Sequence, residues 1–252
     1  MGLRRRPPCS MNFFHHISNS YQSQATIVTS GLGIHYDFRN AACYPGSGNV
    51  VTDLSGNGRS LVFVNLATWT GTYFDFDGVN DYGSISNIAS VDTAGSVGYW
   101  IRLNTTLSTT LLQRISGINA NWEFGRLDAA GEPAATGCSP ANVPTASITA
   151  DLGTFNNTHT NGAFSFTNAV WANLVFTWSI GGTAQTYING SFVHSCAPVN
   201  AARTGTWTIG RSPGNTARYY FGQLGWFTYY NRQLSGTEIL QNFNVTKSNY
   251  GY

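Results

Sequence analysis

Short segments of alternating hydrophobic and polar residues run from about residue 31 to the C-terminus, and turn-forming residues separate them. Alternation over roughly four to eight residues is typical of half-buried β-strands, because successive side chains of a strand point to opposite faces. Such segments lie at 34–38, 61–65, 73–76, 82–85, 97–103, 111–115, 147–152, 163–166, 171–179, 184–188, 191–194, 206–210 and 219–230. They are too many for one open sheet, so the pattern predicts an all-β protein with two packed sheets.

Two local signals add detail to this picture. The pair Asn189-Gly190 lies between two strand-like segments, and both residues tolerate the positive φ that a two-residue hairpin needs. Near the C-terminus, Ser235 and Glu238 have the spacing of a capping box, which marks the start of a helix. An apolar stripe follows the box: Ile239, Leu240 and Phe243. We therefore predict a hairpin at 189–190 and one short C-terminal helix.

The first thirty residues do not share the alternation. Three consecutive arginines, Arg4, Arg5 and Arg6, precede two prolines, and the aromatic pair Phe13 and Phe14 follows. A block of positive charge is either a solvated tail or a segment that docks on an acidic neighbour. These five residues are therefore the candidates for an arm that contacts other protein subunits.

The domain division follows from this change of pattern. Residues 1–30 are predicted to form an extended basic N-terminal arm, and 31–252 one β-sandwich domain, because no linker interrupts the alternation after residue 31. All-β domains of this length often form a single unit.

Composition excludes several classes of function. Only 10% of the residues are charged, against roughly 25% in typical soluble domains, so hydroxyl and amide side chains must form the surface. The net charge of +2 is too small to favour a nucleic-acid partner. No apolar stretch reaches the roughly 18 residues of a membrane span, and no secretory signal is evident. Such a surface suits an extracellular protein or a subunit of a particle.

The four cysteines, Cys9, Cys43, Cys138 and Cys196, show no Cys-x-x-Cys spacing, which argues against a zinc ribbon or a thioredoxin-type motif. Their pairing is open. If a disulfide forms, we expect it between Cys138 and Cys196, because both lie in segments that contain proline.

A series of motifs resembles a known family. Residues 73–82, Tyr-Phe-Asp-Phe-Asp-Gly-Val-Asn-Asp-Tyr, resemble the FDGxxDY hallmark of laminin G-like domains in the concanavalin A-like lectin and glucanase superfamily. Further segments that are similar to family landmarks follow in order at 98–101, 171–178, 187–190, 208–211 and 221–239. The resemblance implies a two-sheet, concanavalin A-like jelly-roll sandwich.

The motifs also have a physical interpretation as scaffold. We expect Trp100, Trp171 and Trp178 to fill the space between the sheets, because large aromatic rings supply most of a core's buried area. Gly210 is expected to let a strand pass close to a bulky neighbour. A scaffold of this kind identifies a fold and not a function.

Catalysis is not expected. A glycosidase of this superfamily would need two carboxylates on either side of the scissile bond, and the chain has only three glutamates, Glu123, Glu132 and Glu238. Asp75 and Asp77 alternate along one predicted strand, but they belong to the structural motif. We therefore predict a protein that is not an enzyme and has no catalytic residues.

A calcium site is a weaker alternative, and no other cofactor is expected. Relatives often bind calcium through oxygen ligands on rim loops, and Asp77, Asn80 and Asp81 supply such oxygens within five residues. The same residue types also form hydrogen bonds within tight turns. We favour the turn interpretation and predict no metal site.

Glycan binding would use exposed aromatic rings beside polar side chains. The candidates are Trp122, Arg211, Tyr219, Tyr220 and Trp226. Aromatic residues are 14% of the chain, and the sequence does not separate exposed rings from core rings.

Three functions remain, in order of preference. The first is a structural or decorating subunit of a large assembly, a virus particle in particular, because laminin G-like domains occur in proteins of large DNA viruses and tailed phages. The second is a carbohydrate-binding or adhesion module, assisted by calcium in one version. The third is a glycoside hydrolase. The first implies a location on a virion surface or capsid, and the others an extracellular one.

Overall fold

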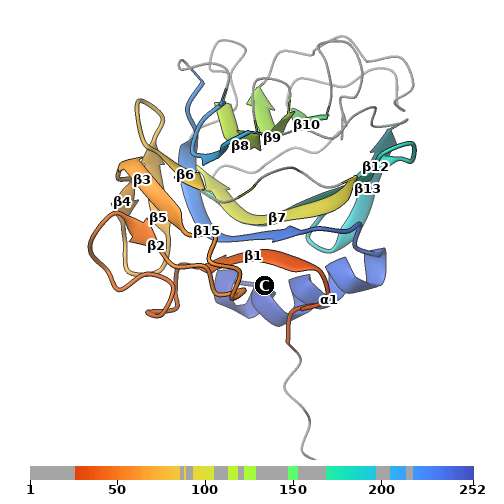
Figure 1. The fold of residues 1–252 in the computed structure, drawn as a ribbon, viewed down its shortest axis with the longest axis horizontal. Helices are drawn as coiled ribbons and strands as arrows, with labels where there is room; N and C mark the ends of the chain where they lie inside the picture. Colours follow the sequence, from red (N-terminus) through yellow and green to blue (C-terminus); the bar gives the residue numbers. More distant parts are fainter. Residues whose placement is uncertain are drawn as a thin grey trace, which may run out of the picture.

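Two antiparallel β-sheets face each other and enclose an aromatic core (Figure 1). The structure is a computed structural model that describes residues 26–85, 88, 93–104, 113–118, 122–128, 147–152, 169–196, 205–213 and 218–252. The arm candidates Arg4, Arg5, Arg6, Phe13 and Phe14 lie outside these residues, as do Glu132 and the predicted strand at 163–166. The sandwich predicted from the alternation is confirmed.

The first sheet, sheet A, has eight strands. Seven follow the order β13 (Ser191–Cys196), β12 (Ala184–Ile188), β11 (Trp171–Ser179), β7 (Ala94–Leu103), β15 (Phe221–Tyr230), β5 (Phe74–Asp77) and β4 (Thr68–Trp69). The eighth, β1 (Leu32–Asp37), also pairs with β15. The long strand β15 therefore pairs on one side with β7 and on the other with β5 in its first half and β1 in its second half.

The second sheet, sheet B, has seven strands. Their order is β10 (Ser147–Leu152), β9 (Trp122–Asp128), β8 (Gln113–Ile118), β14 (Trp207–Ile209), β6 (Tyr82–Ile85), β3 (Leu61–Asn65) and β2 (Val50–Val51). The predicted hairpin joins β12 to β13 in sheet A, and Asn189 and Gly190 adopt φ of 51° and 77°.

The core between the sheets contains Trp178 and Trp207, both fully buried. The expectation that Trp100 and Trp171 also lie there is wrong. Along β7 the side chains of Val97, Tyr99 and Ile101 belong to the inter-sheet core, so Trp100 points to the outer face of sheet A, where it packs with C-terminal residues.

The predicted C-terminal helix is present as α1 (Gly236–Thr246), followed by the 3₁₀ helix η1 (Lys247–Tyr250). Its capping box is complete, because Ser235 Oγ accepts from the Glu238 amide and Glu238 Oε2 accepts from the Ser235 amide at 2.9 Å. Helix α1 covers the outer face of sheet A, on the side away from β8, β9 and β10 (Figure 1). Ile239 and Phe243 are buried there, whereas Leu240 is exposed.

Residues 26–30, the last part of the predicted arm, lie against this helix region. The Val28 amide donates to Asn242 Oδ1 at 2.8 Å, and the Tyr230 hydroxyl donates to the Val28 carbonyl at 2.9 Å. Gln241 Nε2 donates to the Thr26 carbonyl. The sandwich therefore makes contacts with its own chain as far back as Thr26, and the partner of residues 1–25 stays a prediction.

The helix cap makes the stability of the fold depend on pH in the acid range. The Arg232 guanidinium, which donates to Glu238 Oε2 at 3.0 Å, lowers the pKa of Glu238 from 4.5 to about 2. Because the folded-state pKa is the lower one, this contact stabilises the fold fully above about pH 4.5 and is lost as the pH falls towards 2.

We therefore expect Glu238→Gln to flatten the dependence of the unfolding free energy on pH between about 5 and 2. The variant keeps a capping box, since glutamine can replace glutamate at this position, so the comparison isolates the charge. Urea denaturation of both proteins across this pH range measures the effect. Parallel acid profiles for variant and parent would show that the ion pair is not responsible.

Candidate functional site

The structure brings together two of the predicted glycan-binding residues. Arg211 and Tyr219 form an isolated β-bridge, and the Arg211 guanidinium lies 3.7 Å from the centroid of the Tyr82 ring. The rings of Tyr82 and Tyr219 are 6.4 Å apart. All three side chains are half-buried, so each presents part of its surface to solvent. We call Tyr82, Arg211 and Tyr219 the rim cluster.

The rim cluster lies on the outer face of sheet B. Tyr82 is on β6, where Gly83 and Ile85 face the core and Tyr82 and Ser84 face outward. Thr208 of β14 lies opposite Ser84 and Gly117 in the next strands, and its hydroxyl donates to the Arg211 carbonyl at 3.1 Å. Thr208 is 4% exposed and Gly117 is buried, so Ser84 is the one of these three residues that is partly exposed beside the cluster.

The calcium candidates form the turn that leads into β6. Asp77 Oδ1 accepts from the amides of Val79 and Asn80 at 2.8 and 3.2 Å, and Asp81 Oδ2 accepts from the Asp77 amide at 2.9 Å. Burial raises the pKa of Asp81. The carboxylates thus hold the turn, which is the use that the sequence interpretation favoured. Calcium binding here stays a prediction.

This turn and the rim cluster are held together by Gly210. Its φ is +94°, and a Cβ at this position would lie 2.7 Å from the Asp81 carbonyl oxygen. Only glycine allows the backbone at 210 to come this close to Asp81. Because Arg211 is the next residue, this close approach fixes the position of its backbone beside Tyr82. The sugar candidates Arg211 and Tyr219 and the turn with Asp81 therefore occupy one end of sheet B.

Two other predicted glycan-binding residues are buried, and both predictions are corrected. Tyr220 has no exposed surface, and its hydroxyl donates to the carbonyls of Arg102 and Gln223 at 3.3 and 3.0 Å. Trp226 is 3% exposed, and its Nε1 donates to His35 Nε2 at 3.1 Å. Neither ring has a free face for a sugar.

Trp122, the last candidate, begins strand β9, where its backbone lies between Ile118 of β8 and Leu152 of β10. Its side chain lies outside the described part of the structure. Its role in glycan binding therefore stays a prediction.

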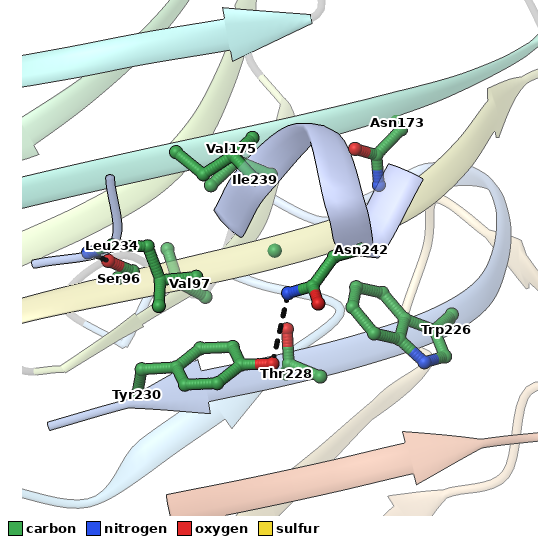
Figure 2. A pocket seen from close by; sticks show the side chains of 11 residues that line it. Ser96, Val97, Asn173, Val175, Trp226, Thr228, Tyr230, Leu234, Ile239 and Asn242 are labelled. Atoms are coloured by element: carbon green, nitrogen blue, oxygen red, sulfur yellow. Dashed lines mark hydrogen bonds between the residues drawn. The ribbon is translucent and has the colours of Figure 1, made fainter. Parts of the chain in front are cut away.

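A small cavity lies between α1 and sheet A (Figure 2). It is enclosed by Val175, Trp226 and Ile239 among others, and Asn242 Nδ2 donates across it to the Tyr230 hydroxyl at 3.0 Å. Its free volume of about 10 Å³ corresponds to roughly one water molecule. The cavity is too small for a sugar. It is a packing gap between α1 and sheet A.

An open groove lies on the other side of Trp226, between β1 and the C-terminal helices. Its volume is about 550 Å³, and its polar lining includes His35, Asp37, Asn244 and Asn249. Burial lowers the pKa of His35. Since His35 Nε2 accepts a hydrogen bond, the neutral imidazole carries its proton on Nδ1. The volume suits a small ligand. Trp226 also lines the groove, but only 3% of its surface is exposed.

The described residues hold no group of three or more His, Cys, Asp or Glu side chains that could bind a metal. Cys43 is a buried free thiol, and burial raises its pKa to about 12. A thiol with this pKa stays protonated at neutral pH and is a poor nucleophile. Cys138, one half of the predicted disulfide, lies outside the described residues.

Two of the described carboxylates are engaged in structural contacts. Glu238 is held by the helix cap, and Asp77 holds a turn. The backbone register places Glu123 of β9 directly opposite Gly117 of β8 and Asp151 of β10. The side chains of this last pair lie outside the described part of the structure, so the absence of catalysis stays a prediction. No described helix is long and apolar enough to cross a membrane.

Solved structures share this fold at low sequence identity. Domain 4 of AbnA, an extracellular arabinanase from Geobacillus stearothermophilus in complex with arabinotriose, is 15% identical with a TM-score of 0.56, over 84% of this chain and 98% of that domain. The binding domain of botulinum neurotoxin DC in complex with SialylT is 14% identical with a TM-score of 0.62, over 86% of this chain.

A mutant sialidase of Trypanosoma rangeli with trans-sialidase activity is also 14% identical, with a TM-score of 0.62 over 90% of this chain. The chain spans 51% of the neurotoxin binding domain and 35% of the sialidase. At these identities the likeness establishes the fold alone. No curated protein sequence matches the chain.

The family assignment rests on sequence as well as on fold. The Laminin_G_3 family model, described as the concanavalin A-like lectin/glucanases superfamily, matches residues 77–240, from the end of β5 into α1. This segment contains most of the motifs on which the resemblance was based. The chain belongs to the concanavalin A-like lectin/glucanase superfamily, as a laminin G-like domain.

Proposed function

We propose that the protein is a carbohydrate-binding module and that the rim cluster is its binding site. The observation that carries this proposal is the half-exposed Tyr82 ring with the Arg211 guanidinium stacked on it and Tyr219 beside it. Aromatic rings pack against the apolar faces of sugars, and polar groups beside them bind the hydroxyls.

The electrostatics of Arg211 favour a polar ligand. No carboxylate of the described residues lies within ion-pair distance of its guanidinium, which is instead held by the Tyr82 ring. An arginine has five N–H donors, and stacking uses none of them. Arg211 Nε is buried, so the donors on the two terminal nitrogens are the ones that hydroxyl or carboxylate groups of a glycan would use, in an orientation that the stack fixes in advance.

The comparisons support this function over particle architecture, which the sequence analysis ranks first. The arabinanase domain is matched over almost its whole length and was solved with arabinotriose. The neurotoxin binding domain was solved with SialylT, although this chain spans only about half of it. A role in a virus particle stays a separate prediction that depends on the N-terminal arm, residues 1–30, and it is compatible with glycan binding.

Replacing Tyr82 with Ala is expected to weaken oligosaccharide binding about tenfold or more, because it removes the stacking surface and the support of Arg211. The probe is an array of immobilised neutral and sialylated oligosaccharides, arabinotriose among them, followed by titration of those that bind. Tyr82→Phe is the matched control, since it keeps the ring and should keep most of the affinity.

The same array with EDTA in place of calcium tests the turn at 77–81. An array that binds the parent protein in neither condition would contradict the proposed function. Equal affinities of Tyr82→Ala and the parent would contradict the placing of the site at the rim cluster.

A further inference from the structure

A continuous row of polar and aromatic residues crosses sheet A on the face opposite to the core. Registers place Thr68 of β4 opposite Asp75 of β5, and Asp75 opposite Gln223 of β15. The row continues from Gln223 to Arg102 of β7 and ends at Trp171 of β11. We call these five residues the outer strip. No member was a sequence candidate for ligand binding.

The strip lies on the outer face of sheet A because its neighbours along each strand face the core. Phe74 and Phe76 flank Asp75 and are buried in the inter-sheet core, as are Ile101 and Leu103 on either side of Arg102. Thr68 is exposed, and Asp75, Arg102 and Trp171 are half-buried, whereas Gln223 is 6% exposed at the centre of the row. Helix α1 covers the same sheet further along the strands, over Trp100 and Trp226.

The polar members hold one another in fixed orientations. Arg102 Nε donates to Gln223 Oε1, and Gln223 Nε2 donates to Asp75 Oδ2 at 3.3 Å. Asn104 Nδ2 donates to Asp75 Oδ1 at 2.6 Å, and Arg102 Nη2 donates to the Tyr73 hydroxyl at 3.3 Å. A network in which each side chain is positioned by the next is pre-organised for a ligand.

This network leaves hydrogen-bonding capacity unused. Arg102 has five N–H donors, of which the bonds to Gln223 and Tyr73 use two. Each Asp75 oxygen accepts one of the bonds named above, and a carboxylate has roughly four acceptor sites. The half-buried strip therefore offers both donors and acceptors to a ligand.

The Trp171 end of the strip is aromatic. The Tyr73 and Trp171 ring centroids are 5.3 Å apart, and the Arg102 guanidinium lies 5.5 and 5.4 Å from them. On its other side Trp171 packs against Tyr250, with centroids 4.9 Å apart. These contacts already hold the rings in place. A ligand that stacks on their exposed parts would therefore cost little side-chain conformational entropy.

We propose that the outer strip is a second binding site and that its ligand is a linear neutral oligosaccharide. Five adjacent strands at roughly 4.8 Å spacing span about 19 Å, which requires an extended ligand. Asp75 and Arg102 give the strip zero net charge, which favours a neutral chain over a nucleic acid or an acidic polymer. Hydroxyls would bind to the polar members, and an apolar sugar face would pack on Trp171 and Tyr73.

This site is independent of the rim cluster, because the two lie on different sheets and share no residue. A protein with both sites would be bivalent and could hold two glycan chains or two parts of one polymer. Bivalence raises the overall strength of attachment to a surface without any new contact.

The test is calorimetric titration of the full chain with linear neutral tetrasaccharides, namely cellotetraose, xylotetraose, mannotetraose and arabinotetraose. Trp171→Ala and Asp75→Ala are each expected to weaken binding of at least one of them about tenfold or more. Tyr82→Ala at the rim cluster is titrated in parallel. Leu240→Ala, at an exposed position of α1 outside both sites, is the control and should leave that affinity unchanged. Thermal unfolding shows whether each variant is folded, and Asp75→Ala decides if Trp171→Ala is not.

The outcomes distinguish binding at the outer strip from binding at the rim cluster. Loss of binding in the strip variants alone supports the outer strip, even if the rim cluster proves inactive. Loss in Tyr82→Ala with no change in folded strip variants overturns the outer strip and leaves the rim cluster standing. Failure of all four tetrasaccharides to bind the parent chain also overturns the strip proposal.

Discussion

Replacing Trp207 with Ala should lower the free energy of unfolding by about 3–5 kcal/mol. Its side chain is fully buried between the sheets and packs against Phe124, Phe227 and Tyr229, with ring centroids 5.2 to 5.8 Å away. Alanine would leave a cavity that strands of two sheets cannot close without breaking their ladders. Since domains are stable by only about 5–15 kcal/mol, the loss would be a large part of the total.

Trp207→Phe is the informative control. The Trp207 indole N–H is buried and has no acceptor among the described residues, so phenylalanine keeps a ring while it removes an unsatisfied donor. We expect it to cost clearly less than alanine. Chemical denaturation of the three proteins measures both differences, and equal losses for the two variants would show that ring packing is not what Trp207 contributes.

The fold was predictable because the relevant signals are local. Alternation marks strands, Asn189-Gly190 marks a hairpin, and Ser235 with Glu238 marks a helix start, and each signal is contained within a few residues. Strands β2 and β4 escaped prediction because each has two residues, too few to show a period. Strand β9 escaped because Gly125 interrupts it with a φ of 67°.

The face of each strand was harder to predict than the strand itself. Alternation separates a buried from a solvated face, but β7 is buried on both faces over most of its length, by the core on one side and by α1 on the other. The two faces then look alike in sequence. For this reason Trp100 could not be told from a residue of the inter-sheet core until the helix position was known.

The exposure of the candidate site residues was hard to predict for the same reason. Tyr219 and Tyr220 are neighbours, and one is half-exposed while the other has no exposed surface. Tyr82 belongs to a family motif that the sequence analysis interprets as scaffold, and its partial exposure under the Arg211 guanidinium is evident only in the folded chain. The outer strip depends on registers between residues as far apart as Asp75 and Gln223, which no local pattern contains.

Replacing Gly210 with Ala should destabilise the fold and weaken glycan binding together. At a φ of +94° a side chain costs roughly 1–2 kcal/mol. The new Cβ would also lie 2.6 Å from Phe76 Cε1 and 2.7 Å from the Asp81 carbonyl oxygen, and such overpacking typically costs about 1–3 kcal/mol more. The backbone has little freedom to move away, because the Gly210 amide donates to the Ile115 carbonyl at 2.7 Å.

Gly56→Ala is the matched control, since Gly56 has a φ of +84° and nothing within 4 Å of the added Cβ. It should show the backbone cost of roughly 1–2 kcal/mol alone and bind oligosaccharides like the parent. Gly210→Ala moves the backbone next to Arg211, so the stack on Tyr82 should open and affinity should fall at a temperature where the variant is still folded. Denaturation and array titration of both variants measure the two effects. If Gly210→Ala costs no more than Gly56→Ala, the close approach to Asp81 is not what requires glycine, and the rim cluster is positioned by other contacts.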